Sequence, residues 1–426
     1  MSDYGTMTAS ELQAEKERLD KEFARIKAKG LSLNMARGKP SAAQLDLSSE
    51  LLKNVDSEDL ILQDGTDARN YGVLDGLPEA KRLMAIFLDD DPDNVIVGGN
   101  SSLNLMYDTL ARCWMFGTLG STPWCQLPKV KWLCPVPGYD RHFGVTESFG
   151  IELIPVPLND EGPNMDEVER LVVDDDAIKG IWCVPKYSNP SGITYSDEVV
   201  NRLASMKTAA PDFRIFWDNA YSVHHLFDDP SEQDHLLDIA QACRKAGTTD
   251  RYYKFASTSK VTFPGAGIAA MAACPENLAE IKARMKPQTI GYDKINQIRH
   301  VRFLKNADGI AAQMRKHAAL LRPKFMLVQD VLEHELSDCG CSWSHPRGGY
   351  FVSFNGPEGT AKRIVSLCKE AGVTLTGAGA TWPHKHDPYD SNIRIAPSLP
   401  PIGELEQALQ VFVVCAKLAT VEKLLA

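Results

Sequence analysis

Lys260 ends a Ser-Thr-Ser-Lys segment, a place where a lysine can react with a carbonyl compound. The segment follows an apolar, strand-like run at 252–256 and leads into a glycine-rich turn at 263–267. An amine that is partly desolvated at a strand end loses its proton more readily and is then nucleophilic near neutral pH. The neighbouring hydroxyls of Ser257 and Ser259 are suited to hold a phosphate group. We interpret Lys260 as a candidate Schiff-base lysine, although this segment alone also fits an ordinary surface lysine.

Other polar side chains occupy the same kind of position, directly after apolar runs. Asn189 follows the run 178–184, and Asp218 ends the next such run, with Tyr221 just beyond it. In open α/β sheets, ligands bind beyond the carboxyl ends of the strands. We therefore expect these three side chains to converge with Lys260 on one crevice.

This set of groups matches what pyridoxal 5'-phosphate requires. A carboxylate such as Asp218 keeps the pyridine nitrogen protonated, so that the ring can accept electrons. The amide of Asn189 and the phenol of Tyr221 can hydrogen-bond to the ring oxygen, and Lys260 can carry the cofactor. The pattern predicts Lys260, Asp218 and Tyr221 as catalytic residues.

With these motifs the chain resembles the fold-type I, class I-like aminotransferases that depend on pyridoxal phosphate, and within them a divergent branch of aspartate aminotransferases. The residues 189–192 are similar to the family's Asn-Pro-Thr-Gly turn, 218–221 to its Asp-x-x-Tyr, and 257–260 to its Ser-x-Ser-Lys. Each motif alone could arise by chance, but the ordered set is specific. The resemblance extends over residues 34–400.

The resemblance implies further cofactor contacts. Tyr71 begins a segment similar to the one whose tyrosine reaches the cofactor phosphate of the neighbouring subunit, which implies a homodimer with shared active sites. The backbone amides of Ser101 and Ser102, at the start of a helical run, can cradle the phosphate, and Tyr139 matches the aromatic ring that stacks on the pyridine. One departure is that residues 264–269 lack the arginine that usually pairs with the phosphate.

The resemblance also implies substrate contacts. Arg394 matches the arginine that holds the substrate α-carboxylate, a task suited to a planar bidentate donor, and Asn189 is expected beside it. Gly38 lies in a segment similar to the family's Gly-x-Pro stretch at the mouth of the site. We expect Arg37 to bind a distal carboxylate, with Arg347 as the second choice. A surface ion pair is the alternative for Arg37.

Together with these residues, the resemblance implies transamination between aspartate and 2-oxoglutarate by a ping-pong mechanism, with Lys260 as the proton shuttle. The amino acids and 2-oxo acids of this reaction are the expected small-molecule partners. Aromatic or alanine-type donors would need a different pocket wall, and a fold-type I lyase or decarboxylase would use the same cofactor residues. A non-catalytic sensor that binds pyridoxal phosphate is the alternative from another class. Such sensors usually carry a DNA-binding segment, for which the residues before Asn34 are too few.

The elements that must position these residues alternate along the chain. Strand-like runs separated by helical stretches at 101–116, 164–173 and 196–209 predict an α/β fold with a mainly parallel seven-stranded sheet covered by helices. A long helical segment is expected at 297–336. We assign residues 1–55 to an N-terminal helix and small-domain segment, 56–309 to the large cofactor-binding domain, and 310–426 to the C-terminal small α+β domain. The expected strands are 95–97, 131–134, 151–156, 178–184, 213–217, 252–256 and 268–273.

Composition narrows the remaining choices. The 426 residues are 44% hydrophobic and 24% charged, enough for a large core. The net charge is −10 and the basic residues are scattered, which argues against a nucleic-acid partner. No apolar run approaches the roughly 18 residues of a membrane span. Residues 2–29 are charge-rich and predict an amphipathic helix with a Thr8–Glu11 capping box, not a targeting sequence.

The cysteines and histidines indicate no metal site. The ten cysteines lack the regular spacing of a disulfide framework, so we expect them to be reduced and the protein to be cytoplasmic. Cys339 and Cys341 lie between His334 and His345, but this spacing fits no standard zinc pattern. His224 is interpreted as a loop residue.

Overall fold

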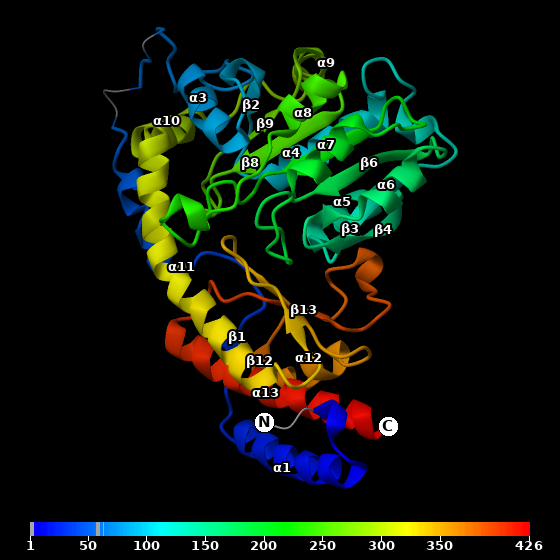
Figure 1. The fold of residues 1–426 in the computed structure, drawn as a ribbon. Coiled ribbons are helices and arrows are strands. Elements are labelled where there is room, and N and C mark those ends of the chain that lie inside the picture. Colours follow the sequence, from blue (N-terminus) through cyan, green and yellow to red (C-terminus); the bar gives the residue numbers. More distant parts are fainter. Residues whose placement is uncertain (1–3, 57–59, 63) are drawn as a thin grey trace.

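The computed structural model describes residues 4–56, 60–62 and 64–426. The described chain forms two lobes, which we call the large lobe and the small lobe (Figure 1). The large lobe is built around an eight-stranded sheet, and the small lobe contains helix α1 (Ala9–Lys27) and helix α13 (Ile402–Leu425) near the two ends of the chain. The long helix α11 (Ala307–Leu336) runs along one side of both lobes.

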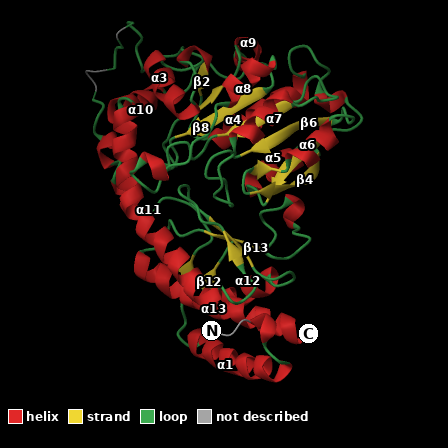
Figure 2. Ribbon diagram, viewed as in Figure 1, coloured by secondary structure: helices red, strands yellow, loops and turns green. Residues whose placement is uncertain are grey.

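The central sheet contains every strand that the sequence predicts. The strand order is β2-β9-β8-β7-β6-β3-β4-β5, and the core strands β8, β7, β6, β3 and β4 are mutually parallel. The two-residue β5 adds an eighth strand at one edge and pairs antiparallel with β4, as β9 does with β2 and β8. Figure 2 shows the strands of this sheet together in the large lobe with helices around them. The strands are β2 (Val95–Val97), β3 (Lys131–Val136), β4 (Glu152–Asn159), β5 (Gly162–Pro163), β6 (Ile178–Cys183), β7 (Arg214–Asp218), β8 (Tyr252–Ser257) and β9 (Ala269–Ala272).

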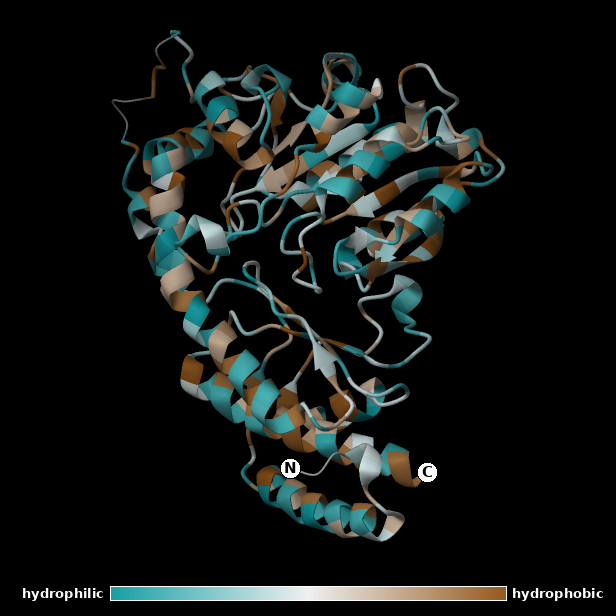
Figure 3. Cartoon of the chain, in the orientation of Figure 1, coloured by the Kyte–Doolittle hydropathy of each residue, from teal (hydrophilic) through white to brown (hydrophobic). Residues whose placement is uncertain are grey.

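Helices cover the sheet, which explains why strands such as β6 and β7 are buried at every residue. Apolar residues are concentrated in the strands and on the inward helix faces, while the outward helix faces are mainly polar (Figure 3). The predicted helix at 196–209 ends earlier, at Ser205, because the chain then turns away and Ala209 N–H donates to Val172 O at 2.8 Å. The helices around the sheet are α3 (Pro78–Leu88), α4 (Ser102–Phe116), α5 (Asp140–Ser148), α6 (Met165–Val172), α7 (Asp197–Ser205), α8 (Ile239–Ala246) and α9 (Pro275–Met285).

The helix predicted over 297–336 is wrong in one respect, because it is two helices. Helix α10 (Lys294–Leu304) ends before Lys305, whose backbone is left-handed with φ 64°. The Asn306 side chain then accepts from Gly309 N–H at 3.0 Å and caps the start of α11. A Cβ at Gly309 would lie 1.9 Å from Leu304 O, so this close approach of the two helices requires glycine.

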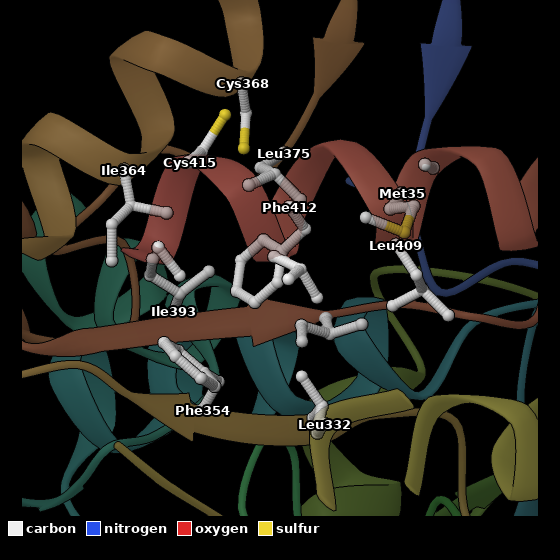
Figure 4. Packing of buried hydrophobic residues seen from close by; sticks show 14 of the residues in the cluster. Met35, Leu332, Phe354, Ile364, Cys368, Leu375, Ile393, Leu409, Phe412 and Cys415 are labelled. Carbon is white, nitrogen blue, oxygen red and sulfur yellow. The ribbon is translucent and has the colours of Figure 1, made fainter. Parts of the chain in front are cut away.

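The small lobe has its own core, in which α13 and α12 (Ala361–Glu370) pack against a small sheet (Figure 4). Helix α1 packs on α13 and begins with the predicted capping box of Thr8 and Glu11, while Ser2 and Asp3 of the predicted segment lie outside the described residues. Two short sheets complete the lobe. They comprise β1 (Leu33–Asn34) parallel to β12 (Val373–Thr374), and the antiparallel β10 (Ser342–Trp343), β11 (Val352–Asn355) and β13 (Asn392–Ile395).

Helix α11 links the two cores. Ile310 and Met314 pack in the large lobe, whereas Leu321 and the apolar residues after it pack in the small lobe. The domain boundaries at residues 55 and 310 stay a prediction. No helix in the described part of the chain is both long and apolar enough to cross a lipid bilayer. Short helical turns complete the fold, with α2 at Ala42–Asp46 and 3-10 helices at Tyr4–Thr6, Ser49–Leu52, Pro92–Asn94, Trp124–Gln126, Pro230–Glu232 and Pro383–Lys385.

Candidate active site

The structure brings together polar residues from the carboxyl ends of three adjacent strands. Asp218 is the last residue of β7, Lys260 lies in the turn after β8, and Asn189 lies in the loop after β6. Tyr221 follows β7 by a short turn, and its ring lies 4.7 Å from Lys260 Nζ. The parallel order β8-β7-β6 thus places at one edge of the sheet groups that are far apart in the sequence.

Asp218 is nearly inaccessible, with 3% of its surface exposed. Its Oδ2 lies 2.9 Å from Nε2 of His142, a residue of α5 that the sequence interpretation missed. The imidazole of His142 stacks on Trp182 at 4.5 Å, which holds the ring in place. The other carboxylate oxygen, Oδ1, is buried and accepts no hydrogen bond from any described residue. This oxygen has acceptor capacity available for a ligand.

The amine of Lys260 lies close to two aromatic rings. Its Nζ is 4.7 Å from the centre of the Tyr221 ring and 5.9 Å from that of Tyr350. Burial lowers the pKa of the Lys260 amine, an effect that the nearby charge of Asp218 opposes. Burial also raises the pKa of Tyr221 well above its ordinary value, so its phenol keeps its proton at neutral pH. The site therefore holds a readily deprotonated amine beside a hydrogen-bond donor.

Arg394 enters from the small lobe, on β13, and is 8% exposed. Its Nη1 donates to Asn189 Oδ1 at 3.2 Å and to Asp140 Oδ1 at 2.9 Å. Nη2 has a long contact of 3.5 Å with Thr376 Oγ1, and the guanidinium lies 4.9 Å from the centre of the Phe351 ring. The flat face of the guanidinium is thus supported by a ring, which suits it to planar recognition of a carboxylate.

A second group of residues gathers at the amino end of α4. The Ser257 hydroxyl donates to Ser259 Oγ at 3.0 Å, and Ser259 Oγ lies 3.5 Å from Asn100 O. Ser101 is the N-cap of α4 and its side chain makes no capping hydrogen bond, so the first N–H groups of the helix stay available. Hydroxyls and helix amides at one place are suited to bind a phosphate.

These features can be tested against pyridoxal phosphate, and they fit it. The unpartnered Asp218 Oδ1 can accept a hydrogen bond from a protonated pyridine nitrogen. The Ser257 and Ser259 hydroxyls and the α4 terminus can hold the phosphate, and the desolvated Lys260 amine is suited to a carbonyl carbon. Tyr139 is the N-cap of α5, its ring lies 4.9 Å from that of His142, and burial raises its pKa to about 12.

Four predicted residues remain to be placed. Tyr71 is 83% exposed in the single chain. Gly38 packs so closely on Phe351 that a Cβ there would lie 2.2 Å from the ring, which places it on the same ring as Arg394. Arg37 is exposed beside it. Arg347 is also exposed and lines a surface hollow with Ser191, His235 and His345.

The sequence interpretation did not assign two residues to the site, His142 and His224, although His224 does lie in a loop as predicted. His142 comes shortly after Tyr139 at the start of a helix that follows a strand, and this position is the one local signal that could have drawn attention to it. His224, interpreted as a loop residue, is 3% exposed with its ring packed between Tyr221 and Tyr350, and burial lowers its pKa well below the ordinary value. Among the described residues, no group of three His, Cys, Asp or Glu side chains is placed to hold a metal ion.

Comparison with known proteins places this chain in a family. The family model described as aspartate amino-transferase matches residues 7–426. An aspartate aminotransferase of Corynebacterium glutamicum is 44% identical over 432 residues, covering 99% of each chain. A crystal structure of an aspartate transaminase from the same species matches with a TM-score of 0.96 at 44% identity, again over 99% of both chains.

More distant structures share the fold. The α-aminoadipate aminotransferase of Thermus thermophilus has a TM-score of 0.72 at 20% identity, covering 94% of this chain and 95% of the other. At that identity the likeness concerns the fold alone, and it confirms the predicted fold-type I architecture. From the full-length family match and the 44% identity, we conclude that the chain belongs to the aspartate aminotransferase family.

Proposed function

We propose that this protein transfers the amino group of aspartate to 2-oxoglutarate with pyridoxal 5'-phosphate as cofactor, in two half-reactions of a ping-pong mechanism. The observation that carries the proposal is the joint placement of three groups. They are a desolvated lysine amine, a buried carboxylate with an unpartnered oxygen, and a nearly buried arginine joined to Asn189. The full-length relationship to an aspartate aminotransferase at 44% identity supports the choice of reaction.

When bound, pyridoxal phosphate supplies an electron sink for the charge that develops at the substrate Cα. The protein's part is to hold and polarise the reacting groups. We assign Asp218 Oδ1 to the ring nitrogen and Tyr221 and Asn189 to the ring oxygen. The phosphate has to be bound without an arginine from residues 264–269, and we assign it to a set of hydroxyls and backbone amides. That set consists of the Ser257 and Ser259 hydroxyls and the Ser101 and Ser102 amides, with Tyr71 from a second subunit.

Lys260 is the proposed acid–base group. Its Nζ removes the proton from the substrate Cα, and the ammonium that results holds this proton for the second proton transfer of the half-reaction, which goes to an atom other than Cα. The lowered pKa leaves a larger fraction of the amine unprotonated at neutral pH than an exposed lysine would have. The Tyr221 and Tyr350 rings limit where the ammonium form can move, because both lie within 6 Å of it. Arg394, oriented by Asn189, holds the α-carboxylate while the proton moves.

The preference for a dicarboxylate rests on a second cation. Arg37 remains our first choice, since it adjoins Gly38, which contacts the same Phe351 ring as Arg394. Arg347 is the second choice. The alternatives are a transaminase for aromatic or alanine-type donors, a lyase or decarboxylase, and a non-catalytic sensor. The family match to residues 7–426 favours a transaminase over a lyase, a decarboxylase or a sensor.

We further propose a homodimer with shared active sites and a cytoplasmic location. The 83% exposure of Tyr71 in one chain supports the first, because an aromatic ring left in solvent is available to a second subunit. All ten cysteines lie in the described residues and carry free thiols, and eight of them are buried, as is usual for a reducing compartment.

A half-reaction experiment tests the proposed function. Holoenzyme is mixed separately with aspartate, glutamate, alanine and phenylalanine, and the cofactor spectrum and the 2-oxo product are followed. We expect fast amino transfer from aspartate and glutamate, and borohydride reduction of the resting enzyme should attach the cofactor to a peptide containing Lys260. Release of carbon dioxide or ammonia in place of amino transfer would refute transamination, and attachment at Lys254 or Lys294 would refute the assignment of Lys260.

A further inference from the structure

Arg394, the proposed binding group for the substrate carboxylate, already contacts a carboxylate of this chain. Asp140 Oδ1 accepts from Nη1 at 2.9 Å, and the same Nη1 donates to Asn189 Oδ1 at 3.2 Å. The two hydrogens of Nη1 are therefore both engaged. Nη2 has only the long contact with Thr376, and Nε meets no acceptor in the described part of the chain.

The two partners of Nη1 differ in how firmly they are held. Asn189 is 4% exposed and cannot leave without a buried amide losing its partner. The side chain of Asp140 is 32% exposed, against 9% for that of Arg394. The Asp140 carboxylate can therefore reach solvent when it leaves the guanidinium, while Asn189 stays with Arg394.

The Asp140 carboxylate can also be stabilised at the amino end of its own helix. It is the first residue of the nine-residue helix α5, and Tyr139, the N-cap, makes no side-chain capping hydrogen bond. The first N–H groups of such a helix favour a carboxylate. If Asp140 stayed on Arg394 when a substrate bound, two carboxylates would share one nearly buried guanidinium and repel each other, which is unfavourable.

We propose that Asp140 is an exchangeable internal carboxylate: it occupies Arg394 in the resting enzyme and is displaced by the carboxylate of the incoming amino acid or 2-oxo acid. This inference rests on the proposed function, because it takes Arg394 as the carboxylate-binding residue. Asn189 is the fixed partner that keeps the guanidinium oriented through the exchange. Asp140 thereby sets how tightly every carboxylate substrate binds, and it takes up Arg394 again as the product leaves.

Binding of maleate, an unreactive dicarboxylate, to the holoenzyme tests this directly. The dissociation constant is measured for the wild type, Asp140→Asn and Asp140→Ser. Removing a partly exposed competing charge should tighten maleate binding about five- to tenfold, and the KM values for aspartate and 2-oxoglutarate should fall in parallel. Asp140→Ser replaces Asp140→Asn if the asparagine variant does not fold. The absorbance of the cofactor shows that each variant has bound it.

Glu147→Gln is the matched control. It removes the same unit of charge from the same helix, but Glu147 faces His384 and not Arg394, so its effect on maleate binding should stay within about twofold. Unchanged or weaker maleate binding in both Asp140 variants would overturn the proposal and make Asp140 a support for Arg394. Arg394→Lys tests separately whether Arg394 binds the substrate carboxylate at all. If this variant binds maleate as well as the wild type does, Arg394 is not the carboxylate-binding residue, and that part of the proposed function is wrong.

Discussion

Replacing Asp218 with asparagine should remove the charge that stabilises the electron-accepting ring while leaving the fold of the site in place. The side chain is 3% exposed and keeps one oxygen on His142 at 2.9 Å, a contact that an asparagine oxygen can also make. The position of Oδ1, unpartnered among the described residues, would instead carry an uncharged amide. The variant therefore isolates the charge at the ring nitrogen.

The magnitude follows from the burial of this carboxylate. Losing one preorganised electrostatic partner in a water-excluded site typically costs about 2.7 to 4 kcal/mol, or about 10²- to 10³-fold in rate. We expect the removal of the Cα proton from aspartate to slow by that factor. We also expect cofactor to dissociate more readily, because the charged form of its ring loses a counter-ion.

Stopped-flow measurement of the aspartate half-reaction at saturating cofactor gives this rate, and a deuterium label at Cα shows whether proton removal limits it. Asp212→Asn is the matched control, because Asp212 is a buried carboxylate just before the other end of β7 and pairs with Lys179 at 2.7 Å. It should lose about 3 to 5 kcal/mol of stability but leave the rate of the folded enzyme unchanged. A near wild-type rate in loaded Asp218→Asn, or an equal slowing in both variants, would refute the reasoning.

Three further predictions follow from the same geometry. If Tyr71 contributes to the active site of the partner subunit, mixing an inactive Tyr71 variant with inactive Lys260→Ala should restore some activity, because hybrid dimers contain one intact site. If no activity returns although the subunits exchange, Tyr71 acts only within its own subunit. Arg37→Ala should slow the half-reaction with aspartate far more than that with alanine. The difference in activation free energy should be about 2 kcal/mol or more if the ion pair between Arg37 and the substrate carboxylate is desolvated. Equal slowing with both donors would assign Arg37 to folding or cofactor binding. Burial lowers the pKa of His317 from 6.5 to about 4, so the unfolded chain takes up a proton at this residue at a higher pH than the folded chain does. Its contribution to stability is therefore lost as the pH drops from 6.5 towards 4. His225 and His300 titrate in the same range, so His317→Gln should make the fall in melting temperature smaller without abolishing it, and an unchanged profile would contradict the assignment.

The sequence by itself determined the secondary structure of the sheet and the family. Runs such as 178–183 and 252–257 are mostly apolar, each with one lysine inside it, which is typical of strands covered on both faces. The polar residues that follow these runs had to lie at one edge of the sheet once the strands were parallel. The break between α10 and α11 was not predicted, although Asn306 is a residue type that favours the start of a helix. It depends on the left-handed backbone of Lys305 and on the Asn306 side chain, which caps the start of α11.

Only the tertiary structure decided which side chains meet. His142 and Asp218 are 76 residues apart in the sequence, and Asp140 and Arg394 are 254 apart and come from different lobes. Such pairs depend on how helices pack on the sheet and how the lobes close on each other, and local residue patterns carry no information on either. The sequence therefore indicated the lysine, the carboxylate and the arginine of the proposed site, while the contacts of His142 with Asp218 and of Asp140 with Arg394 became visible only in the folded chain.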